Sequence, residues 1–272
     1  MSIDERISLL DGLVAAGIDP SRMIPGTGCC SMTETVTLTT HAVKHGCAGV
    51  LMLPPFYYKD VSEEGLYRYF SEVVQRVGDA RLRIYLYHIP PVAMIGITPG
   101  LVERLLKAYP NAIAGMKDSS GDWNNTKSFL DAFAEIPRAP NSFDVFVGSE
   151  MFLLANMRDG GAGTISATAN VNSAAIYELY QKCCGVRRGE SPGITKDFDA
   201  LQTRLNVVRE VFCSGKFPSM IAALKQAIAL YANDPEWVRL RPPLLELTAD
   251  QAKLLGAKLK GLDFGMSGIR RE

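Results

Sequence analysis

The chain has 272 residues, of which 47% are hydrophobic and 21% are charged. This size and composition fit a globular protein, built either as two ordinary domains or as one α/β barrel. The 29 basic and 29 acidic residues cancel, which excludes a strong overall field that would attract nucleic acid or an anionic membrane. A small uncharged or anionic molecule is therefore the expected ligand.

The cysteine pattern and the amino-terminal segment predict where the protein resides. The six cysteines include no Cys-x-x-Cys pair and have no histidine at zinc-ligand spacing from them, so we expect neither a cysteine-based metal site nor a disulfide framework. The first ten residues, MSIDERISLL, are polar and acidic where a signal peptide would be basic and then apolar, and no later run approaches about 20 apolar residues. We predict a reduced, cytoplasmic protein without a membrane span.

The first elements are a helix, a strand, a loop and a second helix. Apolar residues recur at helical spacing over 2–16, and Ser2 with Glu5 forms a capping-box pattern at the start of this helix. In the segment 22–46, a short apolar run leads into a glycine-rich turn and then into a helix that begins near 31–33 and ends at Gly46.

The same strand-and-helix order recurs five more times along the chain. The paired segments are 48–59 with 62–78, 82–91 with 98–110, 112–121 with 124–136, 143–150 with 151–161, and 162–171 with 172–185. Because the strand segments are continuous apolar runs, the strands are expected to be parallel and covered on both faces. Six such units predict a β/α barrel or a doubly wound sheet.

After residue 190 the pattern changes to helices alone, predicted over 193–214, 217–232 and 248–261. No low-complexity tract or long linker separates them from the preceding units. We therefore predict one domain, with a partial β/α barrel over 1–190 and a helical extension over 191–272.

Candidate functional residues follow the predicted strands, where parallel α/β folds place their active sites. Lys117, Tyr87, Tyr57 and the segment 148–150 all lie at such strand ends. Ala, Gly and Met precede Lys117, and partial desolvation there disfavours a charged ammonium.

A neutral lysine amine can attack a ketone and form a Schiff base, an electron sink for making or breaking the adjacent carbon–carbon bond. A phenol such as that of Tyr87 can relay the protons of the intermediate steps. The alternative is a structural ion pair between Lys117 and Asp118 or Glu150, and the spacing of the residues leaves both readings open.

The histidines receive less weight. His41 and His45 have the i, i+4 spacing of a metal pair, but the sequence shows no third ligand nearby, so a solvated helix face is predicted. His88 follows Tyr87 directly and should point to the opposite side of its strand. We do not expect it to act as a catalytic base.

Four motifs carry a resemblance to a known family: LPPFYYKDVSEEGLYRYF, YLYHIPP, AGMKDSSG and GGAGTISATANV. In order and approximate spacing, they resemble the dihydrodipicolinate synthase and N-acetylneuraminate lyase family of pyruvate-dependent class I aldolases. The resemblance runs from about residue 2 to the carboxyl terminus.

This resemblance implies a (β/α)8 TIM barrel with carboxyl-terminal helices, acting on pyruvate and an aldehyde without metal or organic cofactor. Lys117 resembles the family's Schiff-base lysine, and Tyr87 resembles its proton-relay tyrosine. Tyr57 is similar to the tyrosine that family tetramers lend to a neighbouring subunit, which implies a homo-oligomer, tetramer or dimer. Gly148 and Ile165 resemble positions whose backbones line the pyruvate pocket.

The sequence departs from the family at the aldehyde-binding residues. The arginine that holds the aldehyde's carboxylate is replaced by Val92, which argues against aspartate semialdehyde as the partner. Glu150 is placed like acids of the lyase branch that bind sugar hydroxyls, and Ser149 beside it is a further candidate for substrate binding. A solvated carboxylate at a helix amino terminus is the alternative interpretation of Glu150.

Counting by motif, the family's first strand, first helix and second strand have no counterpart, which corresponds to roughly 50 residues. The Gly-Thr-Thr-Gly-Glu loop that binds the pyruvate carboxylate falls in that part. We therefore expect weak activity from a chain that starts at Met1.

Three functions stay open on the sequence. The first is a Schiff-base carbon–carbon lyase or aldolase with an unknown aldehyde partner. The second is a sugar-acid dehydratase or hydratase-aldolase of the same family. The third is a catalytically impaired relative that acts as a binding or assembly module.

Overall fold

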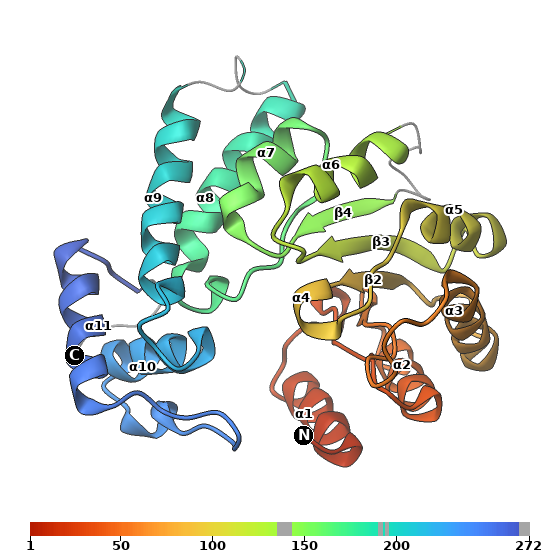
Figure 1. Cartoon of the computed structure of the whole chain (residues 1–272), viewed down its shortest axis with the longest axis horizontal. Helices are drawn as coiled ribbons and strands as arrows, with labels where there is room; N and C mark the ends of the chain where they lie inside the picture. Colours follow the sequence, from red (N-terminus) through yellow and green to blue (C-terminus); the bar gives the residue numbers. More distant parts are fainter. Residues whose placement is uncertain (135–142, 190–192, 194–195, 267–272) are drawn as a thin grey trace. The chain divides into compact units, whose positions relative to one another are not determined.

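The computed structural model describes residues 1–134, 143–189, 193 and 196–266, and these form two compact units (Figure 1). The first unit comprises residues 1–148 and 159–162, and the second comprises 149–158 and 163–272. Among the described residues, no helix is both long and apolar enough to cross a membrane.

The first unit is built on a parallel sheet whose strands follow each other in chain order. The strands are β1 (Val50–Met52), β2 (Ile84–His88), β3 (Ile113–Asp118) and β4 (Asp144–Val147). Each pairs in parallel with the next. Parallel neighbours need a crossover, and helices supply it, as the repeated strand-and-helix pattern predicts.

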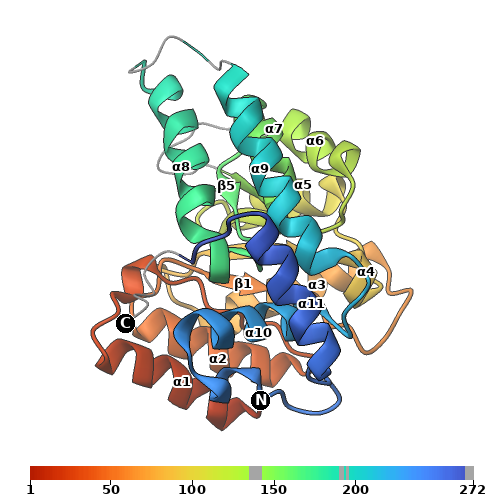
Figure 2. The same ribbon diagram turned by 90° about the vertical axis from the view of Figure 1, so that its left-hand side faces the viewer.

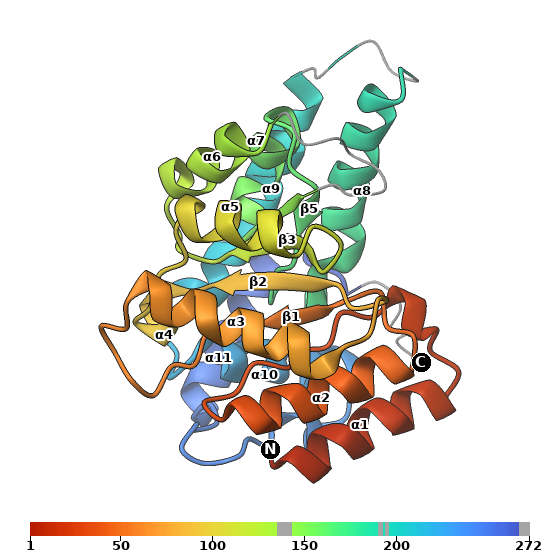
Figure 3. The same ribbon diagram turned by 90° about the vertical axis from the view of Figure 1, so that its right-hand side faces the viewer.

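The helices of this unit form a row in which each contacts the next, as Figure 3 shows for α1, α2 and α3. They are α1 (Ile3–Ala15), α2 (Met32–Lys44), α3 (Glu63–Val77), α4 (Pro90–Ala93), α5 (Pro99–Ala108) and α6 (Trp123–Ala132), with a 3-10 turn at Pro20–Arg22 and with α4 outside the row. The predicted capping box of Ser2 and Glu5 is confirmed, and Ser31 caps α2 through the amide of Glu34.

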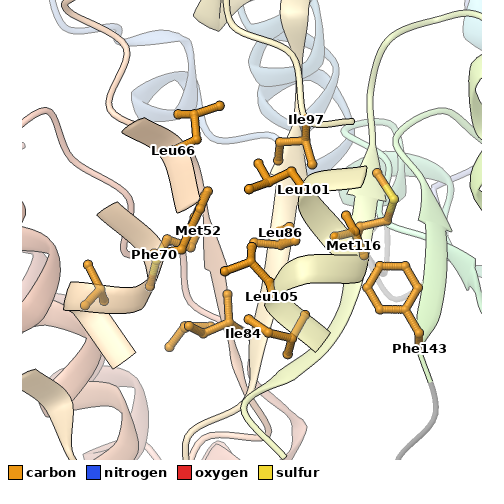
Figure 4. Close-up of a cluster of buried hydrophobic side chains, with 14 of the residues drawn as sticks. Met52, Leu66, Phe70, Ile84, Leu86, Ile97, Leu101, Leu105, Met116 and Phe143 are labelled. Carbon is orange, nitrogen blue, oxygen red and sulfur yellow. The ribbon is translucent and has the colours of Figure 1, made fainter. Parts of the chain in front are cut away.

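The core of the first unit lies between one face of the sheet and helices α3 and α5 (Figure 4). The strands contribute Met52, Ile84 and Leu86, and the helices contribute Phe70 and Leu101, all without accessible surface. Burial of such side chains stabilises a fold by about 1.5–3 kcal/mol each. This face of the sheet is therefore structural, and chemistry requires the other face.

The second unit is helical apart from one two-residue strand. Its elements are the 3-10 turn Glu150–Phe152, α7 (Leu153–Arg158), β5 (Gly163–Thr164), α8 (Ala169–Arg187), α9 (Lys196–Cys213), α10 (Met220–Ala232), the 3-10 turn Pro235–Val238 and α11 (Ala249–Gly261). Helix α9 contacts both α8 and α11, and Figure 2 shows the three helices. The three predicted carboxyl-terminal helices are confirmed.

One expectation about the elements is wrong. The first predicted strand is reduced to a single bridge between Gly26 and Leu51, because Pro25 has no amide hydrogen to continue a ladder. Helix α9, the first of the predicted helical extension, shares a buried cluster with α7 and α8 that includes Leu154, Leu179 and Leu205. Residues 135–136 and 194–195, predicted to be helical, lie outside the described residues.

Candidate active site

The register of the sheet places Tyr87 beside Lys117. The two residues are direct partners in the pairing of β2 with β3, and both lie near the carboxyl ends of their strands. Ile84, Leu86 and His88 point to the buried side of β2, so alternation directs Tyr87 to the opposite face. Both Tyr87 and Lys117 are half-buried.

The amine and the phenol of this pair are in direct contact. Lys117 Nζ donates a hydrogen bond to Tyr87 Oη at 3.1 Å, and the same nitrogen lies 4.3 Å from the centroid of the Tyr87 ring. A hydrogen bond of this length allows a proton to pass between the two groups. The predicted proximity of amine and phenol is therefore present in the structure.

Aromatic side chains line the same face of the sheet. Phe146 on β4 is the other strand partner of Lys117, and its ring lies 5.8 Å from that of Tyr85. Burial, assisted by the carboxylate of Asp144, raises the pKa of Tyr85 to about 12, so this phenol stays neutral at physiological pH. The surroundings of the amine thus include two aromatic rings besides that of Tyr87, one of them an uncharged tyrosine.

The structural ion pair between Lys117 and Asp118 is not formed. Asp118 is buried and accepts hydrogen bonds from the Ser120 amide at 2.8 Å, from Asn125 at 3.1 Å and from Thr126 at 2.6 Å. As neighbours on a strand, Lys117 and Asp118 point to opposite faces. Asp118 therefore stabilises the loop after β3, and the Lys117 amine hydrogen-bonds to the Tyr87 hydroxyl instead.

Gly148 approaches the end of β3 too closely for any other residue. Its amide donates to the Asp118 carbonyl at 2.6 Å, and a Cβ atom there would lie 1.9 Å from Ser119 Oγ. Ser119 directly follows the Lys117–Asp118 pair and donates its own amide to the His88 carbonyl at 2.7 Å. The glycine lets the two strand ends converge, which holds the Lys117 loop in place.

His88 lies on the helix-covered face, as predicted. It is 5% exposed, its Nδ1 accepts the Ile97 amide at 2.9 Å, and its ring packs against Phe129. Burial lowers its pKa, against the opposing influence of Asp118. A neutral, buried imidazole in this position serves packing and loop geometry.

Glu150 contradicts the interpretation of a solvated carboxylate. Its side chain is 0% exposed and belongs to the second unit, where Ser166 and Thr168 donate to it and Arg209 Nη1 lies 3.0 Å from Oε2. Its backbone carbonyl accepts from Gln202 at 2.8 Å. Both carboxylate oxygens accept hydrogen bonds within the second unit, and the role of Glu150 in binding sugar hydroxyls stays a prediction.

Sequence reasoning missed the partners of Glu150. Ser166 and Thr168 lie within the motif GGAGTISATANV and were available as candidates, but Arg209 lies on α9, 59 residues from Glu150. An arginine in an amphipathic helix carries no local signal that it will meet a buried acid.

Comparison with known proteins places the chain in a family. It matches the dihydrodipicolinate synthetase family over residues 1–262. The chain belongs to this family. An uncharacterized DapA-like lyase of Chloroflexus aurantiacus is 31% identical over 260 residues, covering 94% of this chain and 79% of the relative. A 4-hydroxy-tetrahydrodipicolinate synthase of Thermus thermophilus is 42% identical over 161 residues, 59% of this chain and 50% of that enzyme.

Solved structures of the dihydrodipicolinate synthetase family have the same fold. Dihydrodipicolinate synthase from Agrobacterium tumefaciens has a TM-score of 0.76 at 29% identity, over 95% of this chain and 81% of that one. A prophage protein of the same family from E. coli K12, crystallised with pyruvate, has a TM-score of 0.82 at 24% identity, over 97% and 83% of the two chains. The α/β fold with a parallel sheet and carboxyl-terminal helices is thus the family fold.

The other predicted site residues are Tyr57 in the first unit and Ser149 and Ile165 in the second. Tyr57 is 75% exposed and its ring packs edge to face on Tyr58, with centroids 5.4 Å apart. Ser149 caps the 3-10 turn that follows it, and Ile165 is half-buried in the second unit. Their roles in this family member stay predictions. Val92, which replaces the expected arginine, is 71% exposed on α4.

Proposed function

We propose that this protein is a pyruvate-dependent class I aldolase or lyase that uses Lys117 as its Schiff-base residue. The hydrogen bond between Lys117 and Tyr87 carries this proposal. It joins a nucleophile and a proton relay, the two groups that Schiff-base chemistry needs. Membership of a family whose named relatives are lyases and synthases supports it.

In the proposed reaction the Lys117 amine attacks the ketone carbon of pyruvate. The adduct oxygen receives one proton from the amine and one from Tyr87 and leaves as water, and an iminium joins nitrogen to carbon. The Tyr87 phenolate takes a proton from the methyl carbon, which yields an enamine. The enamine forms the new bond to the aldehyde carbon while Tyr87 returns this proton to the aldehyde oxygen. Water then releases the product and restores the amine; the reverse order cleaves the bond.

The aldehyde partner is proposed to lack a carboxylate at the position that an arginine would serve. Val92 has neither charge nor hydrogen-bond donor, so it cannot hold such a group. The burial of Glu150 and the hydrogen bonds to both of its carboxylate oxygens support a partner without a polyhydroxy chain. An aldehyde without a carboxylate at the position of Val92, or with one held elsewhere, is the class of partner that these two observations favour.

A dehydratase or hydratase-aldolase of the same family would share the first steps and differ in what leaves the enamine. Turnover assays separate the two: an aldolase joins pyruvate to an aldehyde, whereas a dehydratase releases water from a sugar acid.

The exposure of Tyr57 supports its proposed insertion into a neighbouring subunit of a homo-oligomer.

Borohydride trapping tests the proposal directly. The full chain is incubated with pyruvate and sodium borohydride, digested and mapped by mass spectrometry. One reduced pyruvyl group on Lys117 is expected. Lys127, which pairs with Asp131 at 2.7 Å on the exposed surface, serves as the internal control and should stay unmodified. Absence of an adduct on Lys117 in folded protein contradicts the proposal and favours a non-catalytic binding role.

A further inference from the structure

Two histidines and one aspartate converge on the outer surface of the first unit. Asp11 on α1 lies opposite His41 on α2 and His45, the C-cap residue of α2. Oδ1 of Asp11 is 2.8 Å from His41 Nε2 and 2.7 Å from His45 Nε2. The sequence predicted a solvated helix face without a third ligand, and the structure supplies that ligand from a different helix.

The three side chains are held on packed helices. His41 and His45 are one turn apart on α2, and their rings meet edge to face with centroids 4.7 Å apart. Helix α1 contacts α2, and Leu10, next to Asp11, is 8% exposed in the core of the unit. The backbone positions of the three groups are therefore set by packing that does not involve the groups themselves.

We propose that Asp11, His41 and His45 form a binding site for a divalent transition metal ion, with Zn²⁺ as the best match. Two imidazole nitrogens and one carboxylate oxygen are the ligand types that zinc combines in three-residue sites, with water in the fourth position. This site is separate from Lys117 and Tyr87 and has no part in the proposed aldolase chemistry.

The distances fit the coordination sphere of zinc. Ligand atoms at about 2.1 Å from a tetrahedral ion lie about 3.4 Å from each other. The candidate ligand atoms of the triad all lie within 4.8 Å of one another, and the two contacts to Asp11 are shorter than the tetrahedral spacing. Shifts of about an ångström or less, within the reach of side-chain rotations, would accommodate the ion.

The triad is accessible to an ion from solvent and carries the required charge. The side chains of His41, His45 and Asp11 are 23%, 27% and 49% exposed. Hydrogen bonds from His45 and His41 lower the pKa of Asp11, so a carboxylate is available at neutral pH. When the ion binds, each neutral imidazole presents its Nε2 lone pair and carries its proton on Nδ1.

A bound ion would join α1 to α2 and thereby stabilise the folded state. Without it, the pair of contacts to Asp11 is an exposed charge interaction of small energetic value. These two roles of the same residues make different predictions, because only the metal site responds to added zinc.

Zinc titration of the full chain, stripped with chelator, tests the site. Calorimetry should give one site per chain, and a 100-fold excess over Kd should raise Tm by about 5 °C. D11A, H41A and H45A should each weaken binding by about tenfold or more. Alanine favours helix at these exposed positions, and far-UV circular dichroism without metal verifies folding. D4N, which removes another exposed carboxylate of α1, should bind like the wild type.

Co²⁺ substitution identifies the ligands independently. The triad should give visible d–d absorption without the thiolate charge-transfer band that Cys30 or Cys213, both exposed, would produce. A thiolate band, unchanged zinc affinity in H41A and H45A, or no zinc binding by the wild type would each overturn the proposal. None of these outcomes bears on trapping at Lys117, so this proposal and the proposed aldolase function fail separately.

Discussion

The two units each contain a polar centre built around one charged residue, and the two centres are opposite in design. In the first unit Lys117 is half-buried and donates a hydrogen bond to a phenol that can exchange protons with it. In the second unit Glu150 is fully buried and is held by two hydroxyl groups and by Arg209.

The two centres differ in the hydrogen bonds that the described residues make to Lys117 Nζ and to the Glu150 carboxylate. A nucleophile needs a neighbour that can take up its proton, and the Lys117 amine contacts the Tyr87 hydroxyl. A buried carboxyl group needs its oxygens hydrogen-bonded, because an unsatisfied buried polar group is costly, and both Glu150 oxygens accept hydrogen bonds. Variants of the two centres should therefore separate loss of chemistry from loss of stability.

The largest effect is expected from Lys117→Arg. A guanidinium stays protonated and cannot form a Schiff base, so trapping should vanish and turnover should fall by at least about 10⁴-fold. The fold should be retained, since one hydrogen bond of a half-buried side chain is lost. Lys127→Arg is the matched control and should trap pyruvate normally. A turnover rate in K117R equal to that of the wild type would exclude a Schiff base on Lys117.

Tyr87→Phe removes the hydroxyl and keeps the ring. Because only the proton relay is lost, turnover should fall by about 10²–10⁴-fold, while slow trapping on Lys117 persists. Tyr85→Phe is the control, since Tyr85 lies two residues earlier on the same face of β2, and its turnover should stay close to the wild-type value. Equal rates in Y87F and Y85F would assign the relay to another group.

Glu150→Gln should act on stability. Loss of the carboxylate leaves Arg209 without its ion-pair partner, which costs about 3 kcal/mol of unfolding free energy, measured by urea denaturation. Glu72→Gln is the control because Glu72 pairs with Arg76 on the exposed surface, and it should cost less than about 1 kcal/mol. Loss of pyruvate trapping in folded E150Q would show that the second centre takes part in the chemistry.

The smallest effect concerns His88 and pH. Burial lowers its pKa below the ordinary value of 6.5, so the unfolded chain binds the proton more readily. Its contribution to stability is complete above pH 6.5 and is lost as the pH falls towards the folded-state pKa. The free energy of unfolding of the wild type, minus that of H88N, should therefore decline below pH 6.5. A difference that is constant with pH would contradict a buried neutral imidazole.

The sequence alone determined the kinds and order of most elements and singled out the candidate reactive residues. Continuous apolar runs predicted parallel strands, capping signals at Ser2 and Ser31 predicted the starts of two helices, and strand-end positions singled out Lys117 and Tyr87. These features depend on local periodicity and on the alternation of side chains along a strand. Both can be read over a few residues.

Only the tertiary structure decided which distant residues meet. It placed Arg209 against Glu150, Asp11 against two histidines, and Ser119 so close to Gly148 that no side chain fits. It also reduced the first predicted strand to one bridge. Each outcome depends on packing between segments far apart in the chain, and the burial and charge partners of a residue are set by that packing.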